Sequence, residues 1–216
     1  MIRIALLFLL SLSQVVLSTA HAAGKDRETR KVLDATAAKL NKAGGISLHF
    51  KATTLLDKVP QDSSEGAMDI MRKKFVITTP DMLSWFDGKT QWTMMKEDEE
   101  VTLTEPTGAE LQAINPYVFL EIYKQGFNYK MTKGTLSNGS KGYKIFLTAD
   151  NAKLEIREIF LEIDENYIPV RVSMRQGKSQ WVRITISSFT TGKRFPDSHF
   201  TFPKDKYPQV EIIDLR

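Results

Sequence analysis

The sequence predicts a mainly β protein (α+β fold class) whose single antiparallel sheet is large and curved and follows one N-terminal helix. Three observations lead to this prediction. After one amphipathic helical stretch, apolar and polar residues alternate with a period of two in about ten short segments. Turn-forming residues separate nearly all of these segments. A sheet of that size must curl or close to protect its edges.

Composition indicates an ordinary folded domain and excludes several other classes. Of the 216 residues, 42% are apolar and 26% are charged, which excludes collagen-like, coiled-coil and disordered chains. The net charge of +4 lacks the concentrated basic surface of a nucleic-acid-binding protein, so no nucleic-acid partner is expected. The absence of cysteine excludes disulfides, thiolate metal sites, cysteine nucleophiles and lipid attachment at an N-terminal cysteine.

The first residues have the pattern of an export signal. Arg3 precedes an unbroken apolar run over residues 4–10, and Ala20-His21-Ala22 has the small residues that signal peptidase requires. We therefore expect residues 1–22 to be a signal peptide that is removed, and residues 23–216 to form one domain. The apolar run is too short to span a bilayer, so the expected destination is the periplasm.

The helix and the strands are predicted in order from the change of period. Residues 26–43 place apolar or small side chains on one helical face and end at Gly44-Gly45. The period then becomes two, which predicts a first strand at residues 46–53. Further strands are expected at residues 68–70, 75–79, 83–86, 91–95, 101–104, 142–148, 153–163, 168–174, 181–188 and 200–202. Turns such as Asp87-Gly88 and Asn138-Gly139 join them in meander order.

Two short helices are predicted to interrupt the strands. Thr107 and Glu110 form a capping box that opens a helix through residue 114, and Pro116 starts a second helix that ends at Gly126. The second helix is apolar almost all round, so both of its sides must be covered. One side can rest on the sheet. The other is covered by another part of the protein, as in a plain core helix, or by a ligand.

The sequence offers little catalytic chemistry. The two histidines of the expected mature chain, His49 and His199, lack the neighbouring ligands of a metal site, and no nucleophile or phosphate-binding motif is present. Acidic residues 62–65 and 97–100 are interpreted as solvated hairpin tips. We therefore expect no enzyme activity, no metal and no cofactor. The aromatic and methionine content indicates an adaptable apolar wall, and so a carrier of an apolar ligand.

Four segments in order resemble the LolA family of periplasmic lipoprotein carriers. They are Gly66-Ala67-Met68-Asp69-Ile70-Met71-Arg72, Asp87-Gly88-Lys89-Thr90-Gln91-Trp92, Asn115-Pro116 before an apolar helix, and Phe200-Thr201-Phe202-Pro203. The resemblance covers nearly the whole mature chain. It implies an incomplete, half-open β-barrel closed at its mouth by short lid helices. It also implies a carrier that receives acylated lipoproteins from an inner-membrane ABC-type release complex and delivers them to an outer-membrane acceptor.

The resemblance also implies roles for particular residues. Arg72 corresponds to an arginine that reaches into the barrel and holds the lid while the cavity is empty. The expected ligand-binding residues are Phe50, Met68, Ile70, Phe75, Trp85, Trp92, Met94, Val118 and Leu120. Lys73 stands where the family usually has proline, and the segment from Arg72 to Phe75 is one residue shorter. Strict alternation then predicts that Phe75 and Ile77 face away from Arg72, while Met68 and Ile70 share its side.

Other functions are compatible with the same fold. A periplasmic lipid-binding sensor or regulatory module of the same half-barrel type is the alternative, although such modules usually carry a second domain. A lipid-anchored receptor would need an N-terminal cysteine, and a hydrolase would need a nucleophile motif. The expected protein is therefore a monomeric carrier.

Overall fold

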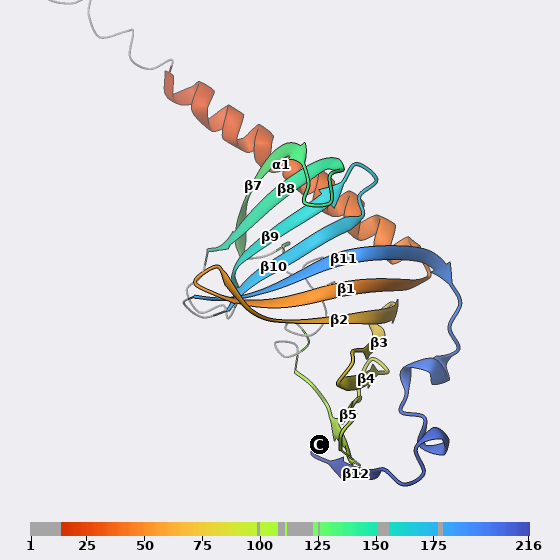
Figure 1. The fold of residues 1–216 in the computed structure, drawn as a ribbon. Helices are drawn as coiled ribbons and strands as arrows, with labels where there is room; N and C mark the ends of the chain where they lie inside the picture. The colour runs from red at the N-terminus through yellow and green to blue at the C-terminus, as the bar shows by residue number, and fades with distance from the viewer. Residues whose placement is uncertain are drawn as a thin grey trace, which may run out of the picture.

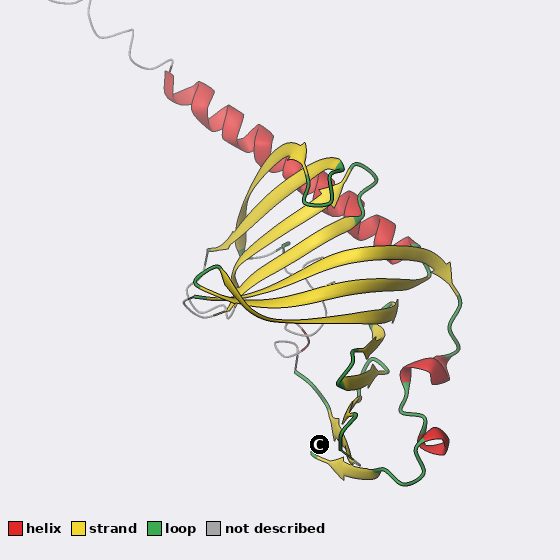
Figure 2. Cartoon of the chain, viewed as in Figure 1, coloured by secondary structure: helices red, strands yellow, loops and turns green. Residues whose placement is uncertain are grey.

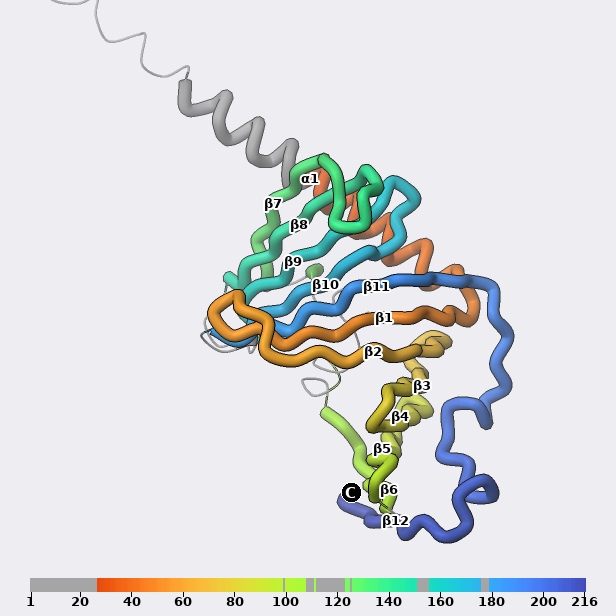
Figure 3. The backbone as a smooth tube through the Cα atoms, viewed as in Figure 1, coloured from red at the N-terminus to blue at the C-terminus, as the bar shows by residue number. Residues whose placement is uncertain are grey.

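A computed structural model describes residues 14–98, 100–107, 111, 123–124, 126–150, 156–176 and 179–216, with side chains from Arg27 onward except Gln176. One long helix lies along a strongly curved sheet (Figure 1). The C-terminal segment returns to the edge of the sheet at residues 100–104, where residues 211–214 pair with them (Figure 3). Among the described residues, no helix is both long and apolar enough to cross a membrane.

The elements follow the predicted order with a few additions (Figure 2). Helix α1 spans Gln14–Lys42, and its last turn carries Lys39 and Lys42, which favour the negative end of the helix dipole. The strands are β1 (Gly45–Leu56), β2 (Val59–Met71), β3 (Lys74–Thr78), β4 (Met82–Phe86), β5 (Gln91–Met95), β6 (Glu100–Thr104), β7 (Phe127–Thr135), β8 (Lys141–Ala149), β9 (Ile156–Asp164), β10 (Pro169–Gln176), β11 (Gln180–Lys193) and β12 (Glu211–Asp214). Two short 3₁₀ helices, η2 (Asp197–Phe200) and η3 (Lys204–Lys206), precede β12.

All twelve of these strands belong to one open sheet, which confirms the predicted curved antiparallel sheet. Their order is β12-β6-β5-β4-β3-β2-β1-β11-β10-β9-β8-β7, and only the β12–β6 pair is parallel. The simple meander is wrong in the middle and at the edges of the sheet. Strand β1 pairs with β11 as well as with β2, and β6 pairs with β12 and not with β7. The chain therefore builds one arm from β1 to β6, crosses to the opposite edge, and builds the second arm from β7 back to β1.

Strand β2 is longer than the sequence predicts. Residues 62–65, interpreted as a hairpin tip, lie inside β2, where Asp62 pairs with Thr54 and Glu65 with Lys51. The Lys51 ammonium lies 3.6 Å from the Glu65 carboxylate. This half of β2 is exposed on both faces, so it needs no apolar alternation, and the pattern that identifies strands is absent there.

Strands β7 and β12 are also additions, and the strand predicted at residues 200–202 is wrong. Phe200 instead ends the 3₁₀ helix η2, with its side chain fully buried. The predicted helices of residues 107–125 fall mostly outside the described residues. Within the described part, the Leu111 backbone N–H donates to the Thr107 carbonyl at 3.0 Å, the residue spacing of an α-helical hydrogen bond.

A glycine pair across β7 and β8 gives the first testable prediction. A Cβ added at Gly142 would lie 2.2 Å from the Ile163 carbonyl oxygen, whereas one added at its cross-strand partner Gly134 meets nothing within 4 Å. Backbone cannot yield as a side chain can, so Gly142→Ala is expected to lower the free energy of unfolding by about 2 kcal/mol. Gly134→Ala is expected to be nearly neutral. Urea denaturation of both variants measures the difference, and equal midpoints would contradict this backbone approach.

Candidate ligand-binding site

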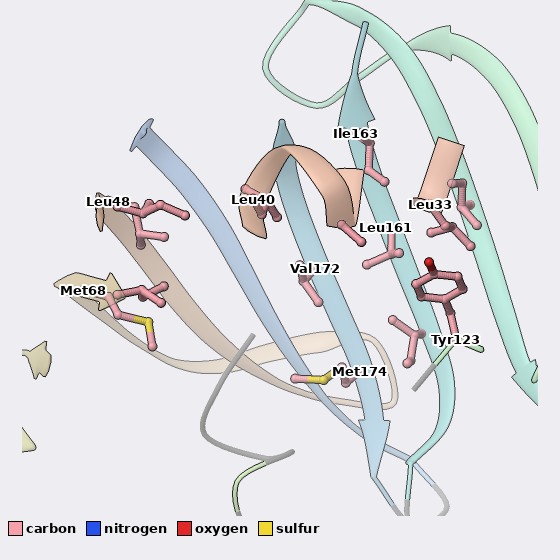
Figure 4. Close-up of a cluster of buried hydrophobic side chains, with 14 of the residues drawn as sticks. Leu33, Leu40, Leu48, Met68, Tyr123, Leu161, Ile163, Val172 and Met174 are labelled. Atoms are coloured by element: carbon pink, nitrogen blue, oxygen red, sulfur yellow. The ribbon is translucent and has the colours of Figure 1, made fainter. Parts of the chain in front are cut away.

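The concave side of the sheet forms one apolar surface that α1 partly covers. Leu33 is fully buried and Leu40 is nearly so, and both point from α1 toward β9 and β10 (Figure 4). The sheet contributes buried residues from both arms. They are Ile46, Leu48, Met68, Ile70, Phe75, Ile77, Phe86, Ile145, Leu147, Ile156, Ile159, Leu161, Ile163, Val172 and Met174. Because these side chains belong to one cluster, the apolar surface runs without a break from β4 to β8.

Tyr123 fixes the end of the connection between the two arms to the helix. Its side chain is buried in the same cluster, and its hydroxyl donates a hydrogen bond to the Asp34 carboxylate of α1. Figure 4 shows the ring lying below Leu33 and beside Leu161. Tyr123 therefore lies on the concave side, within the apolar surface.

Four of the predicted ligand residues come together on this concave side. Met68 and Ile70 of β2 and Phe75 of β3 are buried in the cluster, and Phe50 of β1 packs against it while remaining partly exposed. The prediction that Phe75 and Ile77 face away from the side of Met68 and Ile70 is wrong, because of how the β2–β3 hairpin is paired. Ile70 pairs with Phe75 and Met68 with Ile77, so all four side chains face the same way. Strand alternation does not continue through the turn residues Arg72 and Lys73, so it does not relate the faces of β2 and β3.

Arg72 occupies that turn and not the concave surface. Strand β2 ends at Met71, which pairs directly with Lys74, and Arg72 stands at φ +59 with its side chain exposed. The Lys74 ammonium lies 2.8 Å from the Asp197 carboxylate in the C-terminal segment and lowers the pKa of Asp197. The charge of Arg72 lowers the same pKa to a lesser degree. The predicted reach of Arg72 into the barrel is therefore wrong, because a two-residue turn points it to solvent.

Trp85, Trp92 and Met94 lie on the opposite, outer face of the sheet. The cross-strand row Asp69, Val76, Trp85, Trp92 alternates with the row that carries Ile70 and Phe75. Trp85 and Met94 form a second buried cluster with Val101 and Phe202, and the Trp85 and Phe202 rings meet edge-on at 5.4 Å. Met94 also borders a hollow of about 540 Å³ beside Tyr207. The C-terminal segment thus packs against the cluster that contains Trp85 and Met94, and Trp92 borders that cluster and remains partly exposed.

The turn between the two tryptophans explains the Asp-Gly-Lys-Thr segment. The Asp87 carboxylate accepts hydrogen bonds from the backbone N–H groups of Lys89 at 2.9 Å and Thr90 at 2.8 Å. Gly88 takes φ +103, which other residues rarely adopt. The segment therefore serves to set the β4–β5 register and not to contact a ligand. The predicted lid residues Val118 and Leu120 lie outside the described residues.

Several concave residues were missed by the sequence analysis. Phe127, Tyr129 and Met131 of β7 pack against the cluster and are partly exposed, as are Ile186 and Phe189 of β11. Their alternation at residues 127, 129 and 131 was a usable signal for a half-buried strand. With Phe50, these side chains form an accessible apolar border around the buried surface.

Ser47, Asp69 and His199 form a hydrogen-bonded chain that contains the residue types of a hydrolase. The Ser47 hydroxyl donates to one Asp69 oxygen at 2.6 Å, and a His199 ring nitrogen lies 2.8 Å from the other. The carboxylate therefore stands between serine and imidazole, so the imidazole cannot take the serine proton. Within the described part of the chain, no group of three or more potential metal ligands occurs. These arrangements bind the C-terminal segment to the sheet and supply no activated nucleophile.

Comparison with known proteins identifies what the chain is similar to. Residues 17–178 match the model of the family described as outer membrane lipoprotein carrier protein LolA. No curated protein sequence matches the chain. Among solved structures, an uncharacterized conserved protein from Thermus thermophilus is 9% identical, with a TM-score of 0.56 over 87% of this chain and 99% of that one. That likeness establishes a shared fold.

Two further solved structures are similar at lower TM-scores. A LolA superfamily protein from Nitrosomonas europaea is 10% identical, with a TM-score of 0.44 over 80% of this chain and 97% of that one. LprF from Mycobacterium bovis is 15% identical, with a TM-score of 0.48 over 79% and 96% of the two chains.

Proposed function

This chain belongs to the family of the outer membrane lipoprotein carrier protein LolA, and we propose that it is a periplasmic carrier that shields the acyl chains of lipoproteins. The members of this family are carriers and binding proteins, not enzymes. The single observation that supports the proposal most is the apolar surface on the concave side of the open sheet. Phe50, Met68, Ile70 and Phe75 are its proposed ligand contacts.

The energetics of such a carrier need only a small net affinity. Each buried methylene is worth about 0.8 kcal/mol, so three chains of roughly 15 methylenes represent about 36 kcal/mol relative to water. The donor and acceptor membranes are equally apolar, and only the difference between loaded and empty forms sets the direction of transfer. A difference of a few kcal/mol is sufficient for this. The partly exposed border of the concave surface provides contacts that form and break without unfolding the core.

The proposed path of the protein begins with export. Residues 1–22 would be removed, and the buried side chains of α1 that the structure describes begin at Thr29, within residues 23–216. The proposed partners are an inner-membrane ABC-type release complex that loads acylated lipoproteins and an outer-membrane acceptor that receives them. Residues 118 and 120, between Leu111 and Tyr123, are proposed to contact the acyl chains.

Binding of a fluorescent acyl probe tests the proposal. An environment-sensitive fatty acid is expected to bind the purified protein saturably, with increased fluorescence, because the concave surface replaces water around its chain. An acylated lipoprotein is expected to displace it, and the same lipoprotein without its acyl chains is not. If no saturable binding is measured, or if the deacylated form competes equally well, the carrier function is contradicted.

A further inference from the structure

The side chains on the concave face change from apolar to polar between β3 and β6. Across β2, β3 and β4 its rows carry Ile70, Phe75 and Phe86, then Met68 and Ile77. The same rows continue onto β4, β5 and β6 with polar side chains. Gln91 and Thr104 follow Phe86 in one row, and Ser84, Thr93 and Thr102 follow Ile77 in the other. The apolar surface therefore ends directly against a strip of hydroxyl and amide groups.

Three side chains of this strip form a hydrogen-bonded cluster, in which Ser84 and Gln91 are buried and Thr93 is partly exposed. Gln91 Nε2 donates to Ser84 Oγ at 3.0 Å and to Thr93 Oγ1 at 3.3 Å, and the two hydroxyl oxygens lie 3.2 Å apart. Ser84 is 1% exposed and Gln91 is 7% exposed. Buried polar groups are costly unless each is hydrogen-bonded, so their full set of donors and acceptors must be accounted for.

Counting the donors and acceptors of Ser84, Gln91 and Thr93 leaves one donor and one acceptor without a hydrogen-bond partner. The amide nitrogen of Gln91 has two hydrogens, and both are used. One of the two hydroxyls donates to the other, so whichever way they are oriented one hydroxyl hydrogen remains. Among the described residues, neither this hydrogen nor the Gln91 carbonyl oxygen Oε1 has a hydrogen-bond partner. The cluster thus presents one donor and one acceptor on the concave face.

The chemistry of these groups defines what would bind them. The two polar rows that run from Phe86 to Thr104 and from Ile77 to Thr102 contain no charged side chain, which disfavours a phosphate or a free carboxylate. A neutral carbonyl accepts the free hydroxyl hydrogen, and an amide N–H can in addition donate to Gln91 Oε1. The adjacent Phe86 and Ile77 require that the rest of the ligand be apolar.

We propose that Ser84, Gln91 and Thr93 bind the neutral ester or amide carbonyls that join acyl chains to a head group. This site rests on the proposed carrier function, since it positions the polar end of a ligand whose chains lie on the apolar surface. It fixes the direction of the ligand along the concave face, with the chains toward β3 and β2 and the carbonyls at β4 and β5.

Three ligands with the same C16 chain test the site by displacement of the uncharged probe 1-N-phenylnaphthylamine. They are 1-palmitoylglycerol (ester), N-palmitoylethanolamine (amide) and 1-O-hexadecylglycerol (ether, without a carbonyl). One hydrogen bond is worth about 1 kcal/mol, so the ester or the amide is expected to displace the probe at about fivefold lower concentration than the ether. The relative potency of ester and amide identifies which carbonyl the site prefers.

Variants assign that preference to the cluster. The double variant Ser84→Ala/Thr93→Val removes both hydroxyls, and with them the free hydroxyl hydrogen, and is expected to abolish the preference while the probe still binds. Thr78→Val removes a hydroxyl on the outer face, where Thr78 pairs with Leu83, and is expected to keep the preference. Gln91→Glu, whose carboxylate can accept both hydroxyl hydrogens and so leaves no free donor, serves as a second test if the double variant does not fold.

The outcomes separate the site from the carrier function. Equal potency of ester, amide and ether in the unmodified protein, with normal probe binding, contradicts the site alone. The same holds if the double variant Ser84→Ala/Thr93→Val keeps the preference. Absence of saturable binding for the probe and all three ligands contradicts the carrier function, and the site with it.

Discussion

Replacing Leu33 by alanine is expected to lower the free energy of unfolding by about 3 kcal/mol. Leu33 is fully buried at the contact between α1 and the sheet, opposite Leu161 and Ile163 (Figure 4). Removing a leucine side chain from such a place loses its transfer free energy and leaves a cavity that rigid strands cannot close. The measurement is urea denaturation followed by circular dichroism, with the midpoint shifting and the slope unchanged.

Leu56→Ala is the matched control for this variant. Leu56 ends β1 at the hairpin turn and is 49% exposed, so the same substitution there is expected to cost less than about 1 kcal/mol. If Leu33→Ala costs no more than Leu56→Ala, α1 does not complete the core in solution. The concave surface would then be open to water along β8–β10, and the site described above would have a different shape.

The sequence predicted those elements whose two faces differ. Strands such as β3 and β6 bury one set of alternate residues, and that contrast is what a period of two records. The first half of β2 is solvated on both faces, and β12 is largely exposed, so neither carries the contrast. Their positions are set by pairing with β1 and β6, which is a tertiary property and leaves no local pattern.

The position of the site was harder to predict than the strands. Alternation fixes which residues of one strand share a face, but the relation between strands depends on each turn. The two-residue turn at Arg72-Lys73 places Phe75 beside Ile70, and the Asp87 turn places Trp92 beside Trp85 on the outer face. What covers the outer face is the C-terminal segment with Phe202, about a hundred residues away in sequence, and no local signal predicts that contact.

This division of the sheet into two faces gives the second large prediction. Phe50 and Trp92 are both partly exposed aromatic residues that the sequence suggested as ligand contacts, but Phe50 borders the concave cluster and Trp92 the outer one. Phe50 lies opposite Gly66, whose hydrogen side chain gives the ring room on the concave side. Only Phe50 is therefore placed to contact an acyl chain that lies along β2 and β3.

Phe50→Ala is expected to weaken binding of the acyl probe by about thirtyfold. Losing roughly 80 Å² of apolar contact corresponds to about 2 kcal/mol at 25 cal/mol per Å². Trp92→Ala, measured in the same titration, is expected to leave the affinity within about twofold, since an outer-face aromatic contributes nothing to a concave site. Melting temperatures of both variants separate binding from stability. An equal loss of affinity in the two variants, or a loss confined to Trp92→Ala, would place the ligand on the outer face and contradict the concave site.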